Sequence, residues 1–201
     1  DYSLIEVTNV GENSLAKIGD KIIIAKELVE DVMKEISVLS FNSSNTLKGS
    51  DFAGTVLAHP LNNNGYEHEV LLLEADFVTT DQGTGFVHIA PGHGADDFEL
   101  GRQNNLPIPE TVSDNGILNS DLPLLGGLRV LKDNEIIADI MSEHNALIGR
   151  GKLNHSYPHS WRSKAPLVFR TTPQWFISMT TNNLRDTSLK ALSQTTFYPP
   201  Q

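Results

Sequence analysis

The stretch GTGFVHIAPGHGADDFELG, residues 83–101, constrains the fold more than any other part of this chain. It holds five glycines, two histidines and two adjacent aspartates in nineteen positions. Because glycine tolerates left-handed backbone and close approaches that other residues avoid, the stretch must turn sharply. Its pattern predicts a strand over 86–90 and a turn at Pro91-Gly92. A short helix should follow over 96–105, with acidic residues in its first turn.

The hydrophobic pattern of the remaining chain predicts one α+β domain over 1–201, mainly β with several short helices. Apolar residues at three- and four-residue spacing indicate a helix over 25–36, and 69–80 is the strongest candidate strand, forming a hairpin with 86–90. The other expected elements are short strands within 3–25 and 53–61, helices over 133–147 and 181–194, and a polar, turn-rich segment over 40–52.

Composition excludes several classes of protein. Hydrophobic residues make up 39% and charged residues 20%, which is typical of a globular protein, and no apolar run reaches the length of a membrane span. The chain has no cysteine, so disulfides, thiol nucleophiles and cysteine-bound zinc are ruled out. The N-terminus lacks the basic flank and apolar centre of a signal peptide. We expect a cytoplasmic monomer without a membrane partner.

The distribution of charge leaves two interpretations open. A net charge of −10 argues against general nucleic-acid binding, which depends on neutralising phosphates. Residues 144–185, however, contain six Lys or Arg and no Asp or Glu. This segment either forms a local basic face, suited to RNA or to another part of a larger enzyme, or folds against acids from elsewhere in the chain.

Four interpretations of residues 83–101 follow from the residues alone. The pattern matches neither G-x-G-x-x-G nor the P-loop, so a nucleotide cradle is disfavoured. A metal site would use His88, His93 and Asp96 or Asp97, but their spacing fits no strong zinc motif. A purely structural interpretation makes the glycines turn residues, His88 a core histidine and Asp96 a helix cap. Alternatively, the strand and the helix bring the His88 imidazole and the Asp97 carboxylate to one small pocket, where a carboxylate can hold an ammonium group.

Two segments carry a family resemblance. DQGTGFVHIAPGHGADDFELG resembles the editing-site signature of isoleucyl-tRNA synthetases and, more loosely, of the valyl and leucyl enzymes. HSYPHSWRSKAPLVFRTTPQWFISM is similar to the segment by which that family returns from its inserted editing domain to the catalytic core, so 155–201 includes a return segment. The two occur in the family's order and, with the sequence between them, the resemblance covers nearly the whole chain.

The resemblance implies a β-barrel editing domain of a class I aminoacyl-tRNA synthetase, an enzyme of protein biosynthesis. The implied reaction is water-mediated hydrolysis of the ester in mischarged Val-tRNA(Ile), and also of valyl-adenylate. The implied partners are the 3′ end of tRNA(Ile) carrying valine and the catalytic core of the same polypeptide. Editing needs no metal or other cofactor; ATP and Mg serve only the full-length enzyme. The alternatives are a non-catalytic fragment that binds tRNA or a partner, and the editing domain of a valyl or leucyl relative.

Roles of individual residues follow from the resemblance, position by position. His88 matches the histidine that limits side-chain size, and Asp97 matches the aspartate that holds the α-ammonium group; these two are the expected catalytic residues. The expected substrate-binding residues are Gly83, Thr84, Gly85, His93 and Asp96, the first three by bringing backbone close to the terminal adenosine. The family's Thr-Thr-Thr-Pro-Trp segment has no counterpart in the sequence, so we expect the activity of this chain alone to depend on how much of the pocket that segment supplies. Ser160 stands where many relatives have cysteine.

Overall fold

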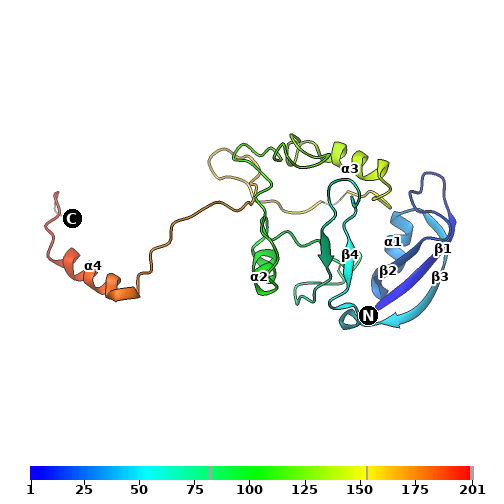
Figure 1. The fold of residues 1–201 in the computed structure, drawn as a ribbon, viewed down its shortest axis with the longest axis horizontal. Coiled ribbons are helices and arrows are strands. Elements are labelled where there is room, and N and C mark those ends of the chain that lie inside the picture. Colours follow the sequence, from blue (N-terminus) through cyan, green and yellow to red (C-terminus); the bar gives the residue numbers. More distant parts are fainter. Residues whose placement is uncertain (82, 153, 200–201) are drawn as a thin grey trace. The chain divides into compact units, whose positions relative to one another are not determined.

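The structure, a computed structural model, describes residues 1–81, 83–152 and 154–199. It divides into two compact units, Asp1–Thr171 and Thr172–Gln201. The first unit contains the buried core, both sheets and three of the α-helices, and the second contains the helix α4 (Figure 1). In the described part of the chain, no helix combines the length and hydropathy that crossing a bilayer would require.

A three-stranded antiparallel sheet opens the first unit. Its strands are β1 (Tyr2–Val10), β2 (Lys21–Ala25) and β3 (Val38–Leu47), in the order β2-β1-β3. Ile5 of β1 lies opposite Ile22 of β2. Before β2 the backbone places Gly19 at a φ of 92°, in the left-handed region that glycine tolerates. Along β1 the buried residues Ser3, Ile5 and Val7 alternate with less buried ones, so one face of the sheet turns toward the core.

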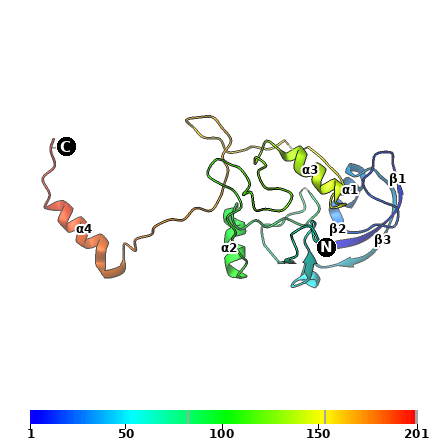
Figure 2. The same cartoon turned by 45° about the horizontal axis from the view of Figure 1, so that its top comes forward.

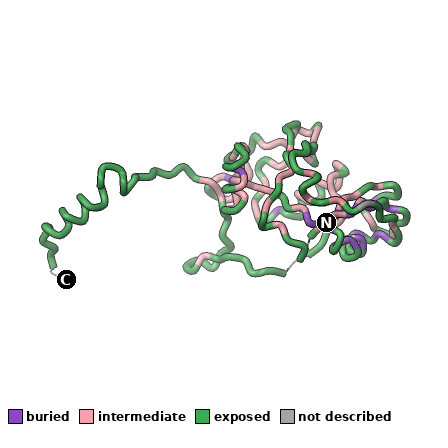
Figure 3. The backbone as a smooth tube through the Cα atoms, turned by 90° about the horizontal axis from the view of Figure 1, so that it is seen from below, coloured by how far each residue is buried: buried purple, intermediate pink, exposed green. Residues whose placement is uncertain are grey.

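The hydrophobic core lies on that face. The 3₁₀ turn Lys26–Leu28 leads into α1 (Val29–Glu35), which packs against the sheet (Figures 1 and 2). Ile5, Ile24 and Met33 are at most 1% exposed and form its centre. Most of the buried positions in Figure 3 belong to this sheet and helix. The remaining members of the core are Val7, Ala16, Ala25, Leu28, Val29, Ile36 and Val38.

Short elements build the rest of the chain. Strands β4 (Val56–Ala58) and β5 (Glu69–Leu71) form a two-stranded antiparallel sheet. Three helices follow in the order of the sequence: α2 (Ala95–Gln103), α3 (Asn134–Glu143) and, in the second unit, α4 (Leu184–Ser193). Two further 3₁₀ turns span Gly49–Phe52 and Thr181–Asn183. The predicted helices therefore all occur, each shorter than its pattern suggested.

The strands differ from the prediction in three ways. The polar segment 40–52, expected to be turns, contributes most of β3, because an edge strand needs backbone pairing with β1 rather than apolar side chains. The long strand over 69–80 shrinks to β5, which pairs with β4 and not with 86–90. Residues 86–90 form no strand, so the predicted hairpin was wrong. The described strands form two open sheets and no closed barrel; the protein is a small α+β fold.

Candidate functional site

The Gly83-Thr84-Gly85 turn is fixed to the three-stranded sheet through its backbone. The Ala25 N–H donates to the Thr84 carbonyl oxygen at 2.9 Å, and the Tyr2 hydroxyl donates to the Gly85 carbonyl oxygen at 2.7 Å. Gly85 has a φ of 82°, and a Cβ there would lie 2.4 Å from the Cβ of Ala25. The glycine therefore permits a close approach between two parts of the protein. The role of these three residues toward a substrate stays a prediction.

The Asp97 side chain forms a hydrogen bond across the turn that follows His88. The turn is made by the Ala90 carbonyl oxygen, which accepts the N–H groups of His93 at 2.8 Å and Gly94 at 3.3 Å. Gly94 is the N-cap of α2, and the Asp97 side chain reaches back from the first helical turn so that its Oδ2 accepts the Ala90 N–H at 3.1 Å. Asp97 is half-buried, at the end of α2 that favours negative charge.

Asp96 does not cap the helix. Gly94 occupies the cap position without a side-chain bond, and Asp96 is exposed in the first turn of α2. The prediction of Asp96 as the cap was therefore wrong, and Asp97 accepts the Ala90 N–H before the helix instead of a helical N–H. Sequence could not separate them, because both follow Gly94 closely and only the direction of the chain before the helix decides which one reaches back.

His93 joins three segments of the first unit. Its Nδ1 lies 2.8 Å from the Phe169 carbonyl oxygen and its Nε2 lies 3.0 Å from the Thr111 hydroxyl oxygen. Because a carbonyl oxygen only accepts, Nδ1 carries the proton and donates, and in the neutral ring Nε2 accepts from Thr111. Both ring nitrogens are thus engaged within the protein. This occupancy weakens the metal-site interpretation, since His93 was one of its ligands.

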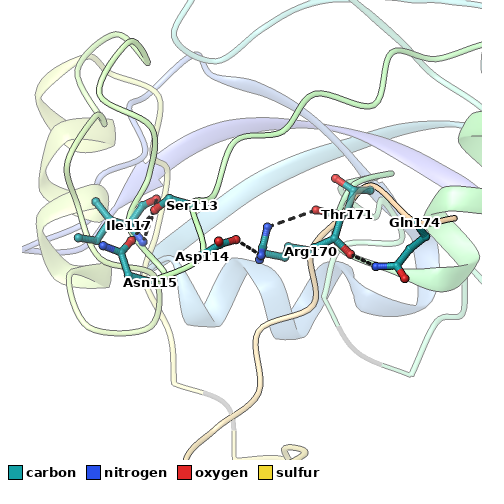
Figure 4. Close-up of polar contacts among 8 residues, drawn as sticks. Ser113, Asp114, Asn115, Ile117, Arg170, Thr171 and Gln174 are labelled. Atoms are coloured by element: carbon teal, nitrogen blue, oxygen red, sulfur yellow. Dashed lines mark hydrogen bonds and ion pairs between the residues drawn. The ribbon is translucent and has the colours of Figure 1, made fainter.

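The basic segment 144–185 meets acids from other parts of the first unit. Arg170 forms an ion pair with Asp114 and also donates to the Thr171 carbonyl oxygen at 3.4 Å (Figure 4). Arg150 pairs with Asp139 of α3 at 2.7 Å. The charge segregation of the sequence is therefore partly neutralised by folding. The folded structure therefore gives less support to a continuous basic face than the sequence did.

His88 is exposed, and two other histidines, His59 and His68, lie together beside Tyr66. The rings of His59 and His68 have centroids 5.0 Å apart, and His59 stacks on Tyr66 at 4.7 Å with an interplanar angle of 15°. The pKa of His59 lies below its ordinary value because burial disfavours the charged imidazolium and because positive charge on His68 and on His88 opposes it. His88 is therefore not the core histidine of the purely structural interpretation.

The structure places the two expected catalytic residues at the two ends of one short segment. Asp97 binds the backbone of Ala90, two residues after His88, and no hydrogen bond joins the two side chains among the described residues. Within the same described ranges, no group of three His, Asp or Glu side chains is placed to hold a metal ion. A separate hollow of about 520 Å³ in the first unit contains none of the predicted site residues; Ser14, Lys17, Asp20, Asn145 and Leu147 are among its lining residues.

Sequence reasoning missed the contacts of His59 with Tyr66 and His68. A signal was present in HPLNNNGYEH, residues 59–68, where two histidines flank a polar, glycine-containing turn. Two histidines at the ends of a turn between paired strands lie opposite each other, but this requires knowing that β4 pairs with β5. The wrong hairpin partner for 69–80 hid this contact.

Comparison with known proteins assigns a family. The family described as "Leucyl-tRNA synthetase, editing domain" matches residues 14–123. The chain is 46% identical over 199 residues to an isoleucine–tRNA ligase of Pelagibacter ubique, covering 99% of this chain and 22% of that protein. Isoleucine–tRNA ligases of Gluconobacter oxydans and Caulobacter vibrioides are 43% and 42% identical, covering 98% of this chain and 22% and 23% of theirs. The chain thus spans about a fifth of the length of the curated relatives it matches. Because the family match covers residues 14–123, which include the 83–101 signature, and the relatives match nearly the whole chain, the chain belongs to the editing-domain family of the aminoacyl-tRNA synthetases.

Proposed function

We propose that the chain is the editing domain of an isoleucyl-tRNA synthetase and hydrolyses the ester of mischarged Val-tRNA(Ile), and also valyl-adenylate. Relatives that are 42–46% identical over nearly the whole chain carry the name isoleucine–tRNA ligase, which favours this member over the valyl and leucyl ones. Valine and isoleucine differ by one methylene, worth about 1–3 kcal/mol in a hydrophobic pocket, and this pair is the established example of that limit. A second site that hydrolyses the mischarged product can remove the valine that such a pocket fails to exclude.

One observation carries the proposal: the disposition of the Asp97 carboxylate. Oδ2 is held by the Ala90 N–H at 3.1 Å, which fixes the orientation of the group, while Oδ1 accepts no hydrogen bond from the described residues. A half-buried, oriented carboxylate with one free oxygen suits a substrate ammonium group, because a charge-assisted hydrogen bond is stronger than a neutral one. Asp97 would thus place the aminoacyl ester, and His88 would limit the side chain that follows.

The chemistry requires little more from the protein. An aminoacyl ester is already activated, so a positioned water suffices as nucleophile. The developing oxyanion would be met by backbone N–H groups of the glycine-rich turns. Editing so described uses no metal and no other cofactor, and ATP and Mg belong to aminoacylation in the whole enzyme. Asp96, His93 and the 83–85 turn would then shape the site without taking part in bond breaking.

The proposal also covers the partners of the domain in the whole protein. We assign the partners as the 3′ end of tRNA(Ile) and the catalytic core of the same polypeptide, in a cytoplasmic enzyme. Trp175 is 100% exposed and Phe176 is 89% exposed, which suits a segment that packs against further parts of a longer chain. Additional strands could join the free edges of β2 and β3, the outer strands of the sheet, and complete the family's β-barrel.

Deacylation of purified Val-tRNA(Ile) by the 201-residue chain tests the proposal. Asp97→Asn keeps an oxygen that can accept the Ala90 N–H and removes the charge, so we expect a loss of about 10–100-fold in kcat/KM with unchanged stability. Glu99→Gln, an exposed change in the same helix, is the matched control and should stay within about twofold, since surface changes seldom matter.

Three outcomes would contradict the proposal. Binding of the tRNA without any hydrolysis by the unaltered chain would favour the non-catalytic alternative. Equal activity of Asp97→Asn and the unaltered chain would remove the ammonium-binding role. Loss of hydrolysis in the presence of a chelator would restore the metal interpretation.

A further inference from the structure

The last stretch of the first unit, residues 154–171, is mostly exposed. Its described residues are all exposed except Ser160, Arg170 and Thr171. Ser160 belongs to a local turn of the stretch itself. Arg170, in contrast, forms an ion pair with Asp114, which lies far away in the sequence. The stretch is therefore anchored to the rest of the first unit by its final residues.

These final residues, 169–171, are called the anchor here, and they lie against the turn before α2. The Phe169 carbonyl oxygen accepts a hydrogen bond from His93 Nδ1 at 2.8 Å. Gly92 of the turn is buried, and a Cβ added to it would lie 3.8 Å from the Thr171 hydroxyl oxygen. The anchor and the turn therefore meet both through a side-chain hydrogen bond and through close packing.

The same turn sets the direction of the Asp97 carboxylate. The Ala90 N–H donates to Asp97 Oδ2 at 3.1 Å, and the Ala90 carbonyl oxygen accepts the His93 N–H at 2.8 Å. Ala90 is thus bonded to both residues, through one backbone group each. A Cβ added at Gly94 would lie 2.9 Å from Asp97 Oδ2, so the carboxylate rests directly on the turn. A displacement of His93 therefore moves the backbone that orients the carboxylate.

The second ring nitrogen of His93 fixes the imidazole from another side. Its Nε2 lies 3.0 Å from the Thr111 hydroxyl, which donates to it because Nδ1 carries the proton. The Thr111 carbonyl oxygen accepts the Asn119 N–H at 3.0 Å, so Thr111 is itself held in a hydrogen-bonded loop. Asp114, the partner of Arg170, belongs to the same loop (Figure 4). The ring therefore bridges this loop and the anchor.

We propose that His93 is a positioning residue that transmits the position of the anchor to the Asp97 carboxylate, and so sets how well the site holds an ammonium group. The inference rests on the proposed function for the role of Asp97. It gives His93 this role in place of direct contact with substrate, because both of its ring nitrogens are engaged within the protein. The strength of a charge-assisted hydrogen bond depends on its geometry, so a carboxylate that is turned away binds the cation less tightly.

Two substitutions at His93 separate its two side-chain hydrogen bonds. In His93→Asn the amide nitrogen takes the place of Nδ1 and keeps the donor to Phe169, but Thr111 loses its partner. In His93→Gln the amide oxygen takes the place of Nε2 and keeps the acceptor for Thr111, but the bond to the anchor is lost.

The orientation of the turn is measured by amide hydrogen exchange of the 201-residue chain, followed by NMR. We expect the Ala90 amide to exchange about tenfold faster in His93→Gln, and to stay within about threefold of the unaltered chain in His93→Asn. The Val7 amide is the internal reference, since it donates to a backbone carbonyl oxygen at 2.9 Å and Val7 is 1% exposed. Its exchange should be the same in all variants, which excludes a general loss of stability.

Affinity for an ammonium group gives the functional readout. The probes are valyl-adenosine with an amide in place of the ester, and the same molecule without its α-amino group. His93→Gln should weaken binding of the first probe about tenfold and keep the second within about twofold, because only the first depends on Asp97. A residue that contacts the ligand itself would be impaired by both substitutions, and a residue that only stabilises the fold would affect both probes alike.

His144→Gln is the matched control, since His144 is also half-buried and has Nδ1 2.8 Å from a backbone carbonyl oxygen, at the end of α3. It should match the unaltered chain in the exchange of Ala90 and in affinity for both probes. Unchanged exchange of Ala90 in His93→Gln, equal changes in the two His93 variants, or equal weakening of the two probes would overturn the inference. If neither probe binds the unaltered chain, the proposed function fails, and the exchange of Ala90 decides the role of His93.

Discussion

Single residues of the glycine-rich stretch act by allowing contact between distant segments. Gly85 lies where the 83–85 turn meets Ala25 at the end of β2, and the Tyr2 ring is 3.2 Å from the position of an added Cβ. The same residue presents its carbonyl oxygen to the Tyr2 hydroxyl. The turn that precedes His88 is therefore held to the hydrophobic core, because Ala25 belongs to that core. A substitution at Gly85 should therefore affect both the turn before His88 and the stability of the sheet.

Gly85→Ala should destabilise the protein by about 2–4 kcal/mol, from a left-handed backbone that costs alanine about 1–2 kcal/mol and from the clash with Ala25. Gly19→Ala is the matched control, since Gly19 has a φ of 92° and nothing within 4 Å of an added Cβ. It should lose only about 1–2 kcal/mol, the backbone cost alone. Urea unfolding followed by far-UV circular dichroism measures both; equal losses would show that the close approach to Ala25 does not matter.

At the scale of elements, the N-cap residue of helix α3 is Asp133, whose carboxylate is hydrogen-bonded to Arg129 before the helix and not to the helix itself. Asp133 is the N-cap residue of α3 but makes no capping bond; its Oδ2 accepts the Arg129 backbone N–H at 2.8 Å, and its Oδ1 accepts from the Arg129 guanidinium at 2.6 Å. These bonds, led by the one from the guanidinium, lower the pKa of Asp133 to about 2. The residue is also among the few buried polar groups of the protein, so it ties the preceding loop to the helix.

The start of α3 should weaken at low pH. The folded pKa of Asp133, about 2, lies below the unfolded value of about 4, so its stabilising contribution is complete above about pH 4 and is lost as pH falls toward 2. Asp133→Asn should remove this contribution at neutral pH and remove its share of the acid dependence. Stability measured in urea between pH 2 and 7 checks this: the gap between the two proteins should close on acidification, and a constant gap would contradict the assignment.

On the scale of the whole molecule, burial is concentrated in one of two units. Every described residue from 172 to 199 is exposed, including all of α4, whereas the first unit holds the entire buried core. A ten-residue helix that buries nothing is marginal by itself, because most helical stability in proteins comes from packing of an apolar face. The second unit thus contributes little to the stability of this chain.

Removal of residues 172–201 should leave the unfolding free energy of the first unit within about 0.5 kcal/mol of the full chain. Met33→Ala serves as the control in both lengths, since Met33 is 1% exposed and its truncation should cost about 2–5 kcal/mol. Chemical unfolding of the four proteins makes the comparison. A loss above about 1 kcal/mol on shortening would show that the second unit supports the core.

Structural features that depend on residues close together in the sequence could be predicted from the sequence. The helices α1 to α4 lie in the segments predicted to be helical, α1 from its apolar spacing and α2 from its start after Gly94, and β1 and β2 lie in the segment predicted to hold short strands. The family and the signature around His88 and Asp97 were also identified from sequence, since a long motif is a local property. The prediction that those two residues line one pocket stays a prediction.

Features that join distant segments were decided only by the tertiary structure. β3 is polar and forms because β1 offers it hydrogen-bonding partners, and β5 pairs with β4 rather than with residues 86–90. The same applies to the contact of His59 with His68 and to the pairing of Arg170 with Asp114. The hydrophobic periodicity of a segment indicates which face of that helix or strand is buried. It does not indicate which other helix or strand packs against that face.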